Sequence, residues 1–92
     1  MSEFDFVLKQ RTLSQVVDGE CVVLDVEAGQ YYGFNDVGTR IWQSLEKGLG
    51  ADQIVAVLVQ EFEVEAAEAR EHIESFIEDL KALDLVRPSL RA

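Results

Sequence analysis

The first half of the chain carries short β-branched and aromatic runs separated by turn residues. Residues 20–26 are rich in valine, residues 27–30 supply a turn, and residues 31–34 resume with aromatic side chains. Two such runs flanking a short turn predict a β-hairpin. Residues 4–8 and residues 14–17 are both short enough and apolar enough to be its partner strand, and the pattern does not decide between them. A three-stranded antiparallel sheet is therefore expected.

The hairpin leads directly into a segment with helical periodicity. Val37, Ile41 and Leu45 recur at a spacing of four residues, which places them on one face of a helix. Asn35 stands just before this segment, where its side-chain oxygen can accept a hydrogen bond from the backbone N–H of Gly38. These features predict a helix that begins immediately after the last strand of the hairpin.

Two more helices are expected in the second half of the chain. Residues 52–62 contain a run that would also suit a buried strand, but its length and the spacing of Ile54, Leu58 and Phe62 favour a helix. Residues 66–83 show the clearest helical rhythm, with apolar positions three and four residues apart and acidic residues between them. Three strands followed by three helices in 92 residues predict a small α+β domain whose helices cover one face of the sheet.

Charge and the scarcity of reactive side chains narrow the possible functions. Eighteen acidic residues against eight basic ones give a formal net charge of −10, which disfavours binding to nucleic acid or to an anionic membrane. One histidine and one cysteine leave no paired constellation for catalysis and no ligand set for a metal, so we expect neither an enzyme nor a cofactor. Cys21 is expected to be a buried apolar residue in a reducing compartment. With no signal peptide and no membrane-spanning run, the expected location is cytoplasmic.

Ten positions in this pattern and the end of the last expected helix match a known family. The ten positions are Leu24, Asp25, Gly29, Tyr31, Tyr32, Phe34, Asn35, Gly38, Ile41 and Trp42. The matching end is the phrase FIEDLKALDLV, although Asp84 stands where the family usually has a glycine. These residues resemble the PqqD-like family. The resemblance covers residues 17–86, and we expect residues 1–92 to form a single peptide-recognition domain.

The resemblance implies a winged-helix-like fold of three strands and three helices that catalyses no reaction. Members of the family are recognition elements for ribosomally made, post-translationally modified peptides. They bind the leader of the precursor peptide as an extra strand beside the third strand, in a groove walled by the third helix. They deliver the precursor to a modifying enzyme or a leader protease. Lasso-peptide maturation is the first expectation for this chain, and quinone-cofactor synthesis of the PQQ type is the second.

Carried over to this sequence, the resemblance makes residues 31–34 the strand edge and residues 66–83 the wall. An exposed edge offers unpaired backbone groups to a peptide, and aromatic rings supply rigid contact area. Tyr31 and Tyr32 point to opposite faces of a strand, so only one can meet the peptide, and the sequence does not say which. The expected leader-binding residues are Tyr31, Tyr32, Gly33 and Phe34, with Ile73 and Ile77 as an apolar floor and Arg70, Glu74 and Lys81 as rim charges.

Other interpretations of the same residues predict different outcomes. Ile73 and Ile77 would serve equally well in the core, whereas a role as groove floor predicts that Ile77→Asp weakens peptide binding and leaves the domain folded. A winged-helix DNA-binding protein would need a basic recognition helix, and residues 66–83 carry mostly glutamates. A carrier protein would need a serine at the start of a helix, a position that neither Ser44 nor Ser75 holds. The remaining alternative is a small acidic adaptor for a folded protein.

Overall fold

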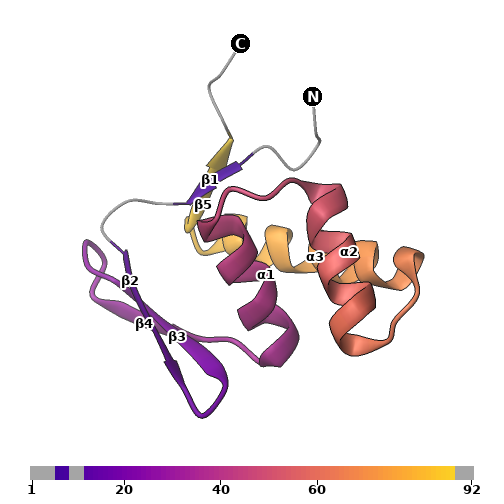
Figure 1. Ribbon diagram of the computed structural model, residues 1–92. Helices are drawn as coiled ribbons and strands as arrows, with labels where there is room; N and C mark the ends of the chain where they lie inside the picture. The colour runs from indigo at the N-terminus through magenta and orange to yellow at the C-terminus, as the bar shows by residue number, and fades with distance from the viewer. Residues whose placement is uncertain (1–5, 9–11, 89–92) are drawn as a thin grey trace.

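The computed structural model describes residues 6–8 and 12–88, which form two small sheets and three helices (Figure 1). The prediction of an α+β domain with a three-stranded sheet followed by three helices is confirmed. In chain order the elements are β1 Phe6–Leu8, β2 Thr12–Val17, β3 Glu20–Asp25, β4 Gln30–Gly33, α1 Asp36–Glu46, α2 Ala51–Phe62, α3 Ala66–Ala82 and β5 Val86–Pro88.

The main sheet has the strand order β2-β3-β4, and both of its strand pairs are antiparallel. The strand that joins the hairpin is therefore β2, which settles the choice between the two earlier segments. β1 instead pairs with β5 in a separate two-stranded sheet that the sequence pattern did not predict. Phe4 and Asp5, the first two residues of the alternative segment, lie outside the described residues.

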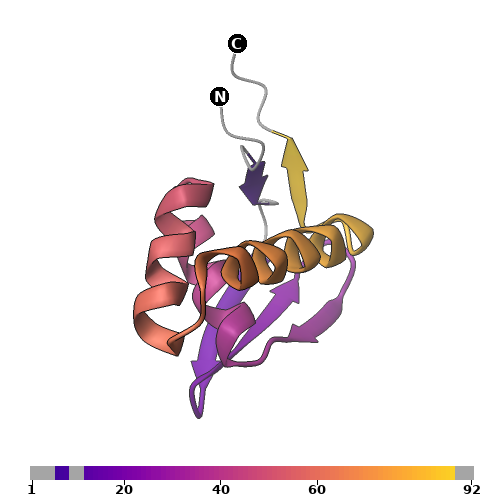
Figure 2. The same cartoon turned by 90° about the vertical axis from the view of Figure 1, so that its right-hand side faces the viewer.

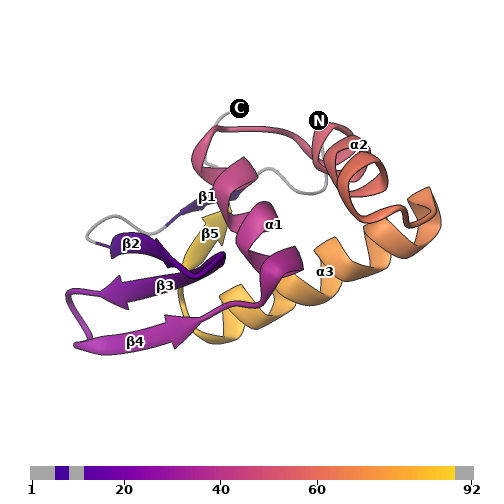
Figure 3. The same ribbon diagram turned by 60° about the horizontal axis from the view of Figure 1, so that its bottom comes forward.

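The helices cover one face of the main sheet. Figure 2 shows α3 lying across the sheet, and Figure 3 shows α1 between the sheet and α2. No helix within residues 6–8 and 12–88 is long and apolar enough to cross a membrane.

Local sequence signals set the helix ends, and the end of α1 is the one predicted above. Asn35 caps α1, because its side-chain oxygen accepts a hydrogen bond of 2.8 Å from the backbone N–H of Gly38. Gly50 caps α2, and its backbone N–H donates to the side chain of Gln53 at 2.9 Å. α3 ends in a Schellman motif with Asp84 at the left-handed position, where its φ is +58°.

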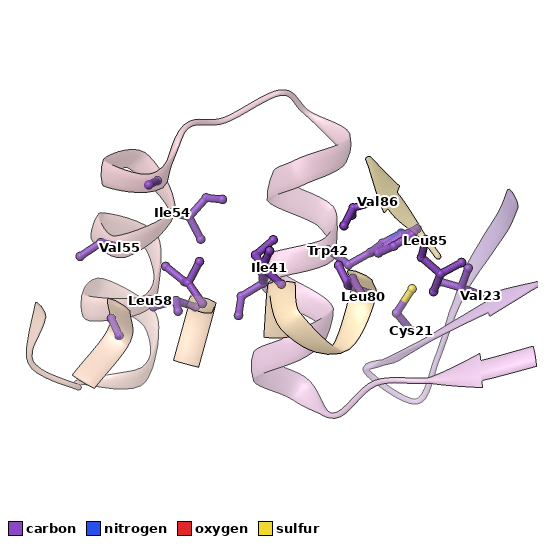
Figure 4. Packing of buried hydrophobic residues seen from close by; sticks show 14 residues of the cluster. Cys21, Val23, Ile41, Trp42, Ile54, Val55, Leu58, Leu80, Leu85 and Val86 are labelled. Atoms are coloured by element: carbon purple, nitrogen blue, oxygen red, sulfur yellow. The ribbon is translucent and has the colours of Figure 1, made fainter. Parts of the chain in front are cut away.

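One apolar core joins the sheet to all three helices (Figure 4). Trp42 of α1 is only 1% exposed and forms the centre of the core between the sheet and α3. Thr39 adds a polar connection, since its hydroxyl accepts a hydrogen bond of 2.7 Å from the backbone N–H of Cys21. This bond fixes the hairpin to α1 and so sets the position of β4 relative to the helices. The core consists of Cys21, Val23, Ile41, Trp42, Ala51, Ile54, Val55, Leu58, Ala69, Ile73, Ile77, Leu80, Leu85 and Val86.

Candidate functional site

The outer edge of β4 is open. β4 pairs with β3 on one side, and the described residues provide no strand on its other side. The backbone N–H of Phe34 donates to the carbonyl of Cys21 in β3 at 2.9 Å. Because neighbouring residues of an antiparallel strand direct their backbone groups to opposite sides, Tyr31 and Gly33 direct their N–H and C=O groups to the open edge. This edge can therefore accept another strand.

The turn before β4 is held in place by Asp25. This side chain is 1% exposed, and its carboxylate accepts a hydrogen bond of 3.1 Å from the backbone N–H of Ala28. Its backbone carbonyl also accepts from the N–H of Gly29 at 2.8 Å, and Gly29 has a φ of +69°. A glycine adopts this left-handed conformation without the steric penalty of a Cβ. Asp25 and Gly29 thus fix where β4 begins.

A groove of about 480 Å³ lies between β4 and the C-terminal half of α3. A second hollow of about 200 Å³ lies farther along α3, where that helix faces the start of α1. Phe76 and Asp79 line both hollows, so the two hollows adjoin, and together they are called the channel. The groove is lined by Tyr31, Tyr32, Gly33, Phe34, Phe76, Asp79, Ala82 and Leu83. The second hollow is lined by Asn35, Val37, Gly38, Ile41, His72, Ser75, Phe76 and Asp79.

Aromatic rings form the inner wall of this channel. The ring of Phe34 lies 5.5 Å from that of Trp42 and 4.9 Å from that of Phe76, the latter pair in an edge-to-face arrangement. Gly38 makes this packing possible, because a Cβ at that position would lie 3.0 Å from Cε1 of Phe76. The channel therefore has an aromatic wall made by Phe34, just after β4, and Phe76 of α3, with Trp42 of α1 packed behind it.

The two tyrosines of β4 have different environments. Tyr32 pairs with the fully buried Val23 and packs against the core, so its side chain lies on the helix-covered face of the sheet. Tyr31 pairs with Leu24, faces away from the helices and is 71% exposed. Tyr32 is thus the tyrosine whose side chain faces the groove, a question that the sequence left open. Tyr31 contributes its backbone at the edge.

The structure corrects the expected positions of Ile73 and Ile77. These side chains are 0% and 2% exposed and belong to the core, so they do not form the floor of the groove. They lie on the side of α3 that packs against the other helices and the sheet. The prediction that Ile77→Asp leaves the domain folded is therefore wrong for a core position. An aspartate there would bury a carboxylate among apolar side chains, so we expect this substitution to unfold the domain.

The expected rim charges also lie elsewhere. Arg70 forms an ion pair of 2.8 Å with Asp52 of α2, and Lys81 pairs with Glu78 on its own helix at 3.2 Å. Glu74 precedes Phe76 by two residues, which places it on nearly the opposite side of a helix with 3.6 residues per turn. None of the three lines the groove or the second hollow. The residues of β4 are thus brought together with α3 as expected, but with a different flank of that helix.

The flank that does face β4 has its own periodicity in the sequence. His72, Phe76, Asp79 and Leu83 follow at spacings of four, three and four residues, next to the core stripe. The pattern shows that such a flank exists, but both flanks of the core stripe satisfy the same periodicity. The choice between them depends on how α3 docks on the sheet.

Among the described residues, the ionisable groups whose pKa is shifted lie outside the channel. Arg40 of α1 donates two hydrogen bonds of 2.7 Å to Glu61 of α2, which lowers the pKa of that carboxyl and raises the pKa of the guanidinium. Burial raises the pKa of the Cys21 thiol, with a smaller contribution from the charge of Glu46. Within the described part of the chain, no three histidine, cysteine or acidic side chains are grouped so as to hold a metal ion.

Comparison with known proteins gives one family and two similar structures. Residues 20–86 match the family model described as coenzyme PQQ synthesis protein D. One similar structure is TbiB1 in complex with the TbiA(beta) leader peptide, which is 27% identical with a TM-score of 0.84 over 92% of this chain and 99% of that one. The other is lasso peptide synthetase B1 complexed with the leader peptide, at 28% identity and a TM-score of 0.82 over 91% and 99%. No curated protein matches.

Proposed function

This chain belongs to the family of coenzyme PQQ synthesis protein D, and from that premise we propose that it binds the leader of a precursor peptide as an added strand on β4. It then delivers the precursor to a modifying enzyme or a leader protease. The observation that carries the proposal is the open edge of β4 beside the groove with α3. Two structures similar to this chain are complexes with leader peptides.

The backbone groups and the groove contribute differently to binding. Tyr31 and Gly33 offer two N–H and two C=O groups, and each hydrogen bond contributes about 0.5–1.5 kcal/mol net. Micromolar affinity requires about 8 kcal/mol. The remainder comes from apolar leader side chains, each of which gains about 1.5–3 kcal/mol on full burial against the wall of Tyr32, Phe34 and Phe76. The backbone thus sets the register and supplies about 2–6 kcal/mol, and the groove supplies the remainder together with the sequence preference.

Within this proposal the chain catalyses no step itself and acts by raising the local concentration of the precursor at its enzyme. We place it in lasso-peptide maturation before quinone-cofactor synthesis, because one of the two similar structures is a lasso peptide synthetase B1. The cytoplasmic location expected from the sequence is part of the same proposal. We also propose that residues 1–92 form one recognition domain.

A bulky side chain placed in the groove tests the proposal. Ala82 lines the groove and is exposed, whereas Ala67 is exposed near the other end of α3, about 22 Å away along the helix axis, and lines neither hollow. Fluorescence anisotropy with a labelled leader, taken from the precursor encoded beside this gene, should show at least about tenfold weaker binding for Ala82→Tyr. Ala67→Tyr should bind like the unaltered chain. Equal affinity of both variants would contradict leader binding in this groove.

A further inference from the structure

The face of the main sheet that points away from the helices is apolar and exposed. The buried positions of β3 alternate with partly exposed ones, which identifies the residues on each face. A row of Leu13, Leu24 and Tyr31 runs across the three strands, since these residues are direct cross-strand partners. Leu13 is 62% exposed and Val17 is 49% exposed. We define the outer sheet face as Leu13, Gln15, Val17, Glu20, Val22, Leu24, Tyr31 and Gly33.

This face is nearly free of charge in a strongly acidic chain. Glu20, at one corner, is the only ionisable acid or base among its eight described positions other than the phenol of Tyr31, while the chain has a formal net charge of −10. Three of the seven large apolar side chains that are exposed in the described residues, those of Leu13, Val17 and Tyr31, belong to this face. Apolar surface with an exposed tyrosine and few charges is typical of the centre of a protein interface.

We propose that the outer sheet face docks the enzyme that receives the precursor, through an apolar patch on that enzyme with neutral or basic surroundings. This inference rests on the proposed function. The charge argues for such a partner over a second copy of this chain, because two molecules that each carry a formal charge of −10 repel one another. A partner with a basic rim would be attracted by the same charge.

The position of the face relative to β4 connects docking with leader capture. Tyr31 carries its side chain on the outer sheet face and its backbone at the open edge of β4. A leader strand added at that edge would extend the same sheet, so alternate leader side chains would lie beside Tyr31 on the outer sheet face. The enzyme would therefore contact this chain and the leader together.

The area of the outer sheet face indicates that the enzyme must contact both this face and the bound leader. A six-residue strand spans about 20 Å and strands lie about 4.8 Å apart, so three strands present roughly 300 Å². A stable protein interface covers about 800 Å² on each partner. The outer sheet face alone falls short of this area, and an added leader strand widens it to roughly 400 Å², so the enzyme must also contact surface beyond the sheet. The enzyme should accordingly bind the leader-loaded chain more tightly than the chain alone, and the coupling must be reciprocal.

Threonine substitutions on β2 test this surface without touching the groove. Leu13→Thr combined with Val17→Thr removes apolar surface, and the threonines that replace these residues are β-branched and suit a strand. Val59→Thr, at a 37% exposed position on α2, is the matched control. The probes are the labelled leader and the purified leader protease encoded with the precursor. Biolayer interferometry measures protease binding to the chain alone and to the chain saturated with leader.

The expected result has four parts. Leader saturation should raise protease affinity at least about fivefold, and the double variant should lower protease affinity at least about tenfold. The double variant should bind leader within about twofold of the unaltered chain, and Val59→Thr should change neither affinity.

Three results would overturn the proposal. Normal leader binding with unchanged protease affinity in the double variant would show that the outer sheet face is not the docking surface. It would leave the proposed function intact. Light scattering that shows a dimer dissolved by the same substitutions would assign the face to a second copy. A failure of the unaltered chain to bind leader at all would overturn the proposed function, and with it this inference.

Discussion

Gly38 connects the stability of the fold with the shape of the groove, and Gly38→Ala tests that connection. A Cβ added to Gly38 would lie 3.0 Å from Cε1 of Phe76, 3.2 Å from Cβ of Phe34 and 3.3 Å from Oδ1 of Asn35. Phe76 lines both hollows of the channel, and Asn35 caps α1. The substitution therefore forces the aromatic wall, the helix cap or both to move.

The sign of the stability change follows from two opposing effects. Alanine is favoured over glycine inside a helix by about 1 kcal/mol, and by less in the first turn, where Gly38 lies. An added methyl in a tightly packed site costs about 1–3 kcal/mol. Phe34 meets the new Cβ with its own Cβ, which moves only with the backbone, so the contact cannot be relieved by a rotamer change alone. We expect Gly38→Ala to lose about 1 kcal/mol of stability and to weaken leader binding.

Urea denaturation followed by circular dichroism gives the free energy of unfolding for this variant. Gly33→Ala is the matched control for stability, because a Cβ at Gly33 meets no atom within 4 Å. The control should be as stable as the unaltered chain or slightly more stable. A Gly38→Ala variant at least as stable as Gly33→Ala, with unchanged leader affinity, would refute the argument that this glycine sets the aromatic wall.

Three further predictions concern positions outside the groove. Cys21 is 1% exposed, and burial raises the pKa of its thiol. A thiol reagent at pH 8 should therefore modify Cys21 only at the rate at which the chain unfolds. Fast modification of the folded chain would contradict this. Glu63→Gly should stabilise the chain by about 0.5 kcal/mol in urea denaturation, because φ is +55° there and only glycine adopts this value freely. The Arg40 hydrogen bonds lower the pKa of Glu61, so their stabilisation is present above the unfolded pKa of about 4.3 and is lost as pH falls through the lowered value. Glu61→Gln should remove this part of the pH dependence of stability. If the free energy of unfolding of this variant fell at acid pH as much as that of the unaltered chain, the result would argue against the pair.

Elements defined by local signals were predictable from the sequence. The cap at Asn35, the reciprocal cap of Gly50 with Gln53 and the helical rhythm of α3 each depend on residues within one or two turns. The choice of β2 as partner strand, and the pairing of β1 with β5, depend on contacts between segments far apart in the chain. β1 and β5 have three residues each, too few to show an alternating pattern.

The site was predictable on its strand side and not on its helix side. The resemblance placed the edge at residues 31–34, and the structure brings that edge beside α3. The periodicity of α3 identifies Ile73 and Ile77 as apolar positions one turn apart. It does not say whether such positions face the core or the groove, because apolar side chains line both. Burial separates them, since the core takes Ile73 and Ile77 and leaves Phe76 at the channel.

Amide hydrogen exchange at β4 tests the central claim most directly. The N–H groups of Tyr31 and Gly33 point to the open edge, whereas that of Phe34 is already bonded to Cys21 and that of Tyr32 faces β3. Saturation with leader should slow exchange at Tyr31 and Gly33 by at least about tenfold, a factor that corresponds to 1.4 kcal/mol, with smaller changes at Tyr32 and Phe34. Leader binding that leaves exchange at Tyr31 and Gly33 unchanged would contradict strand addition at β4.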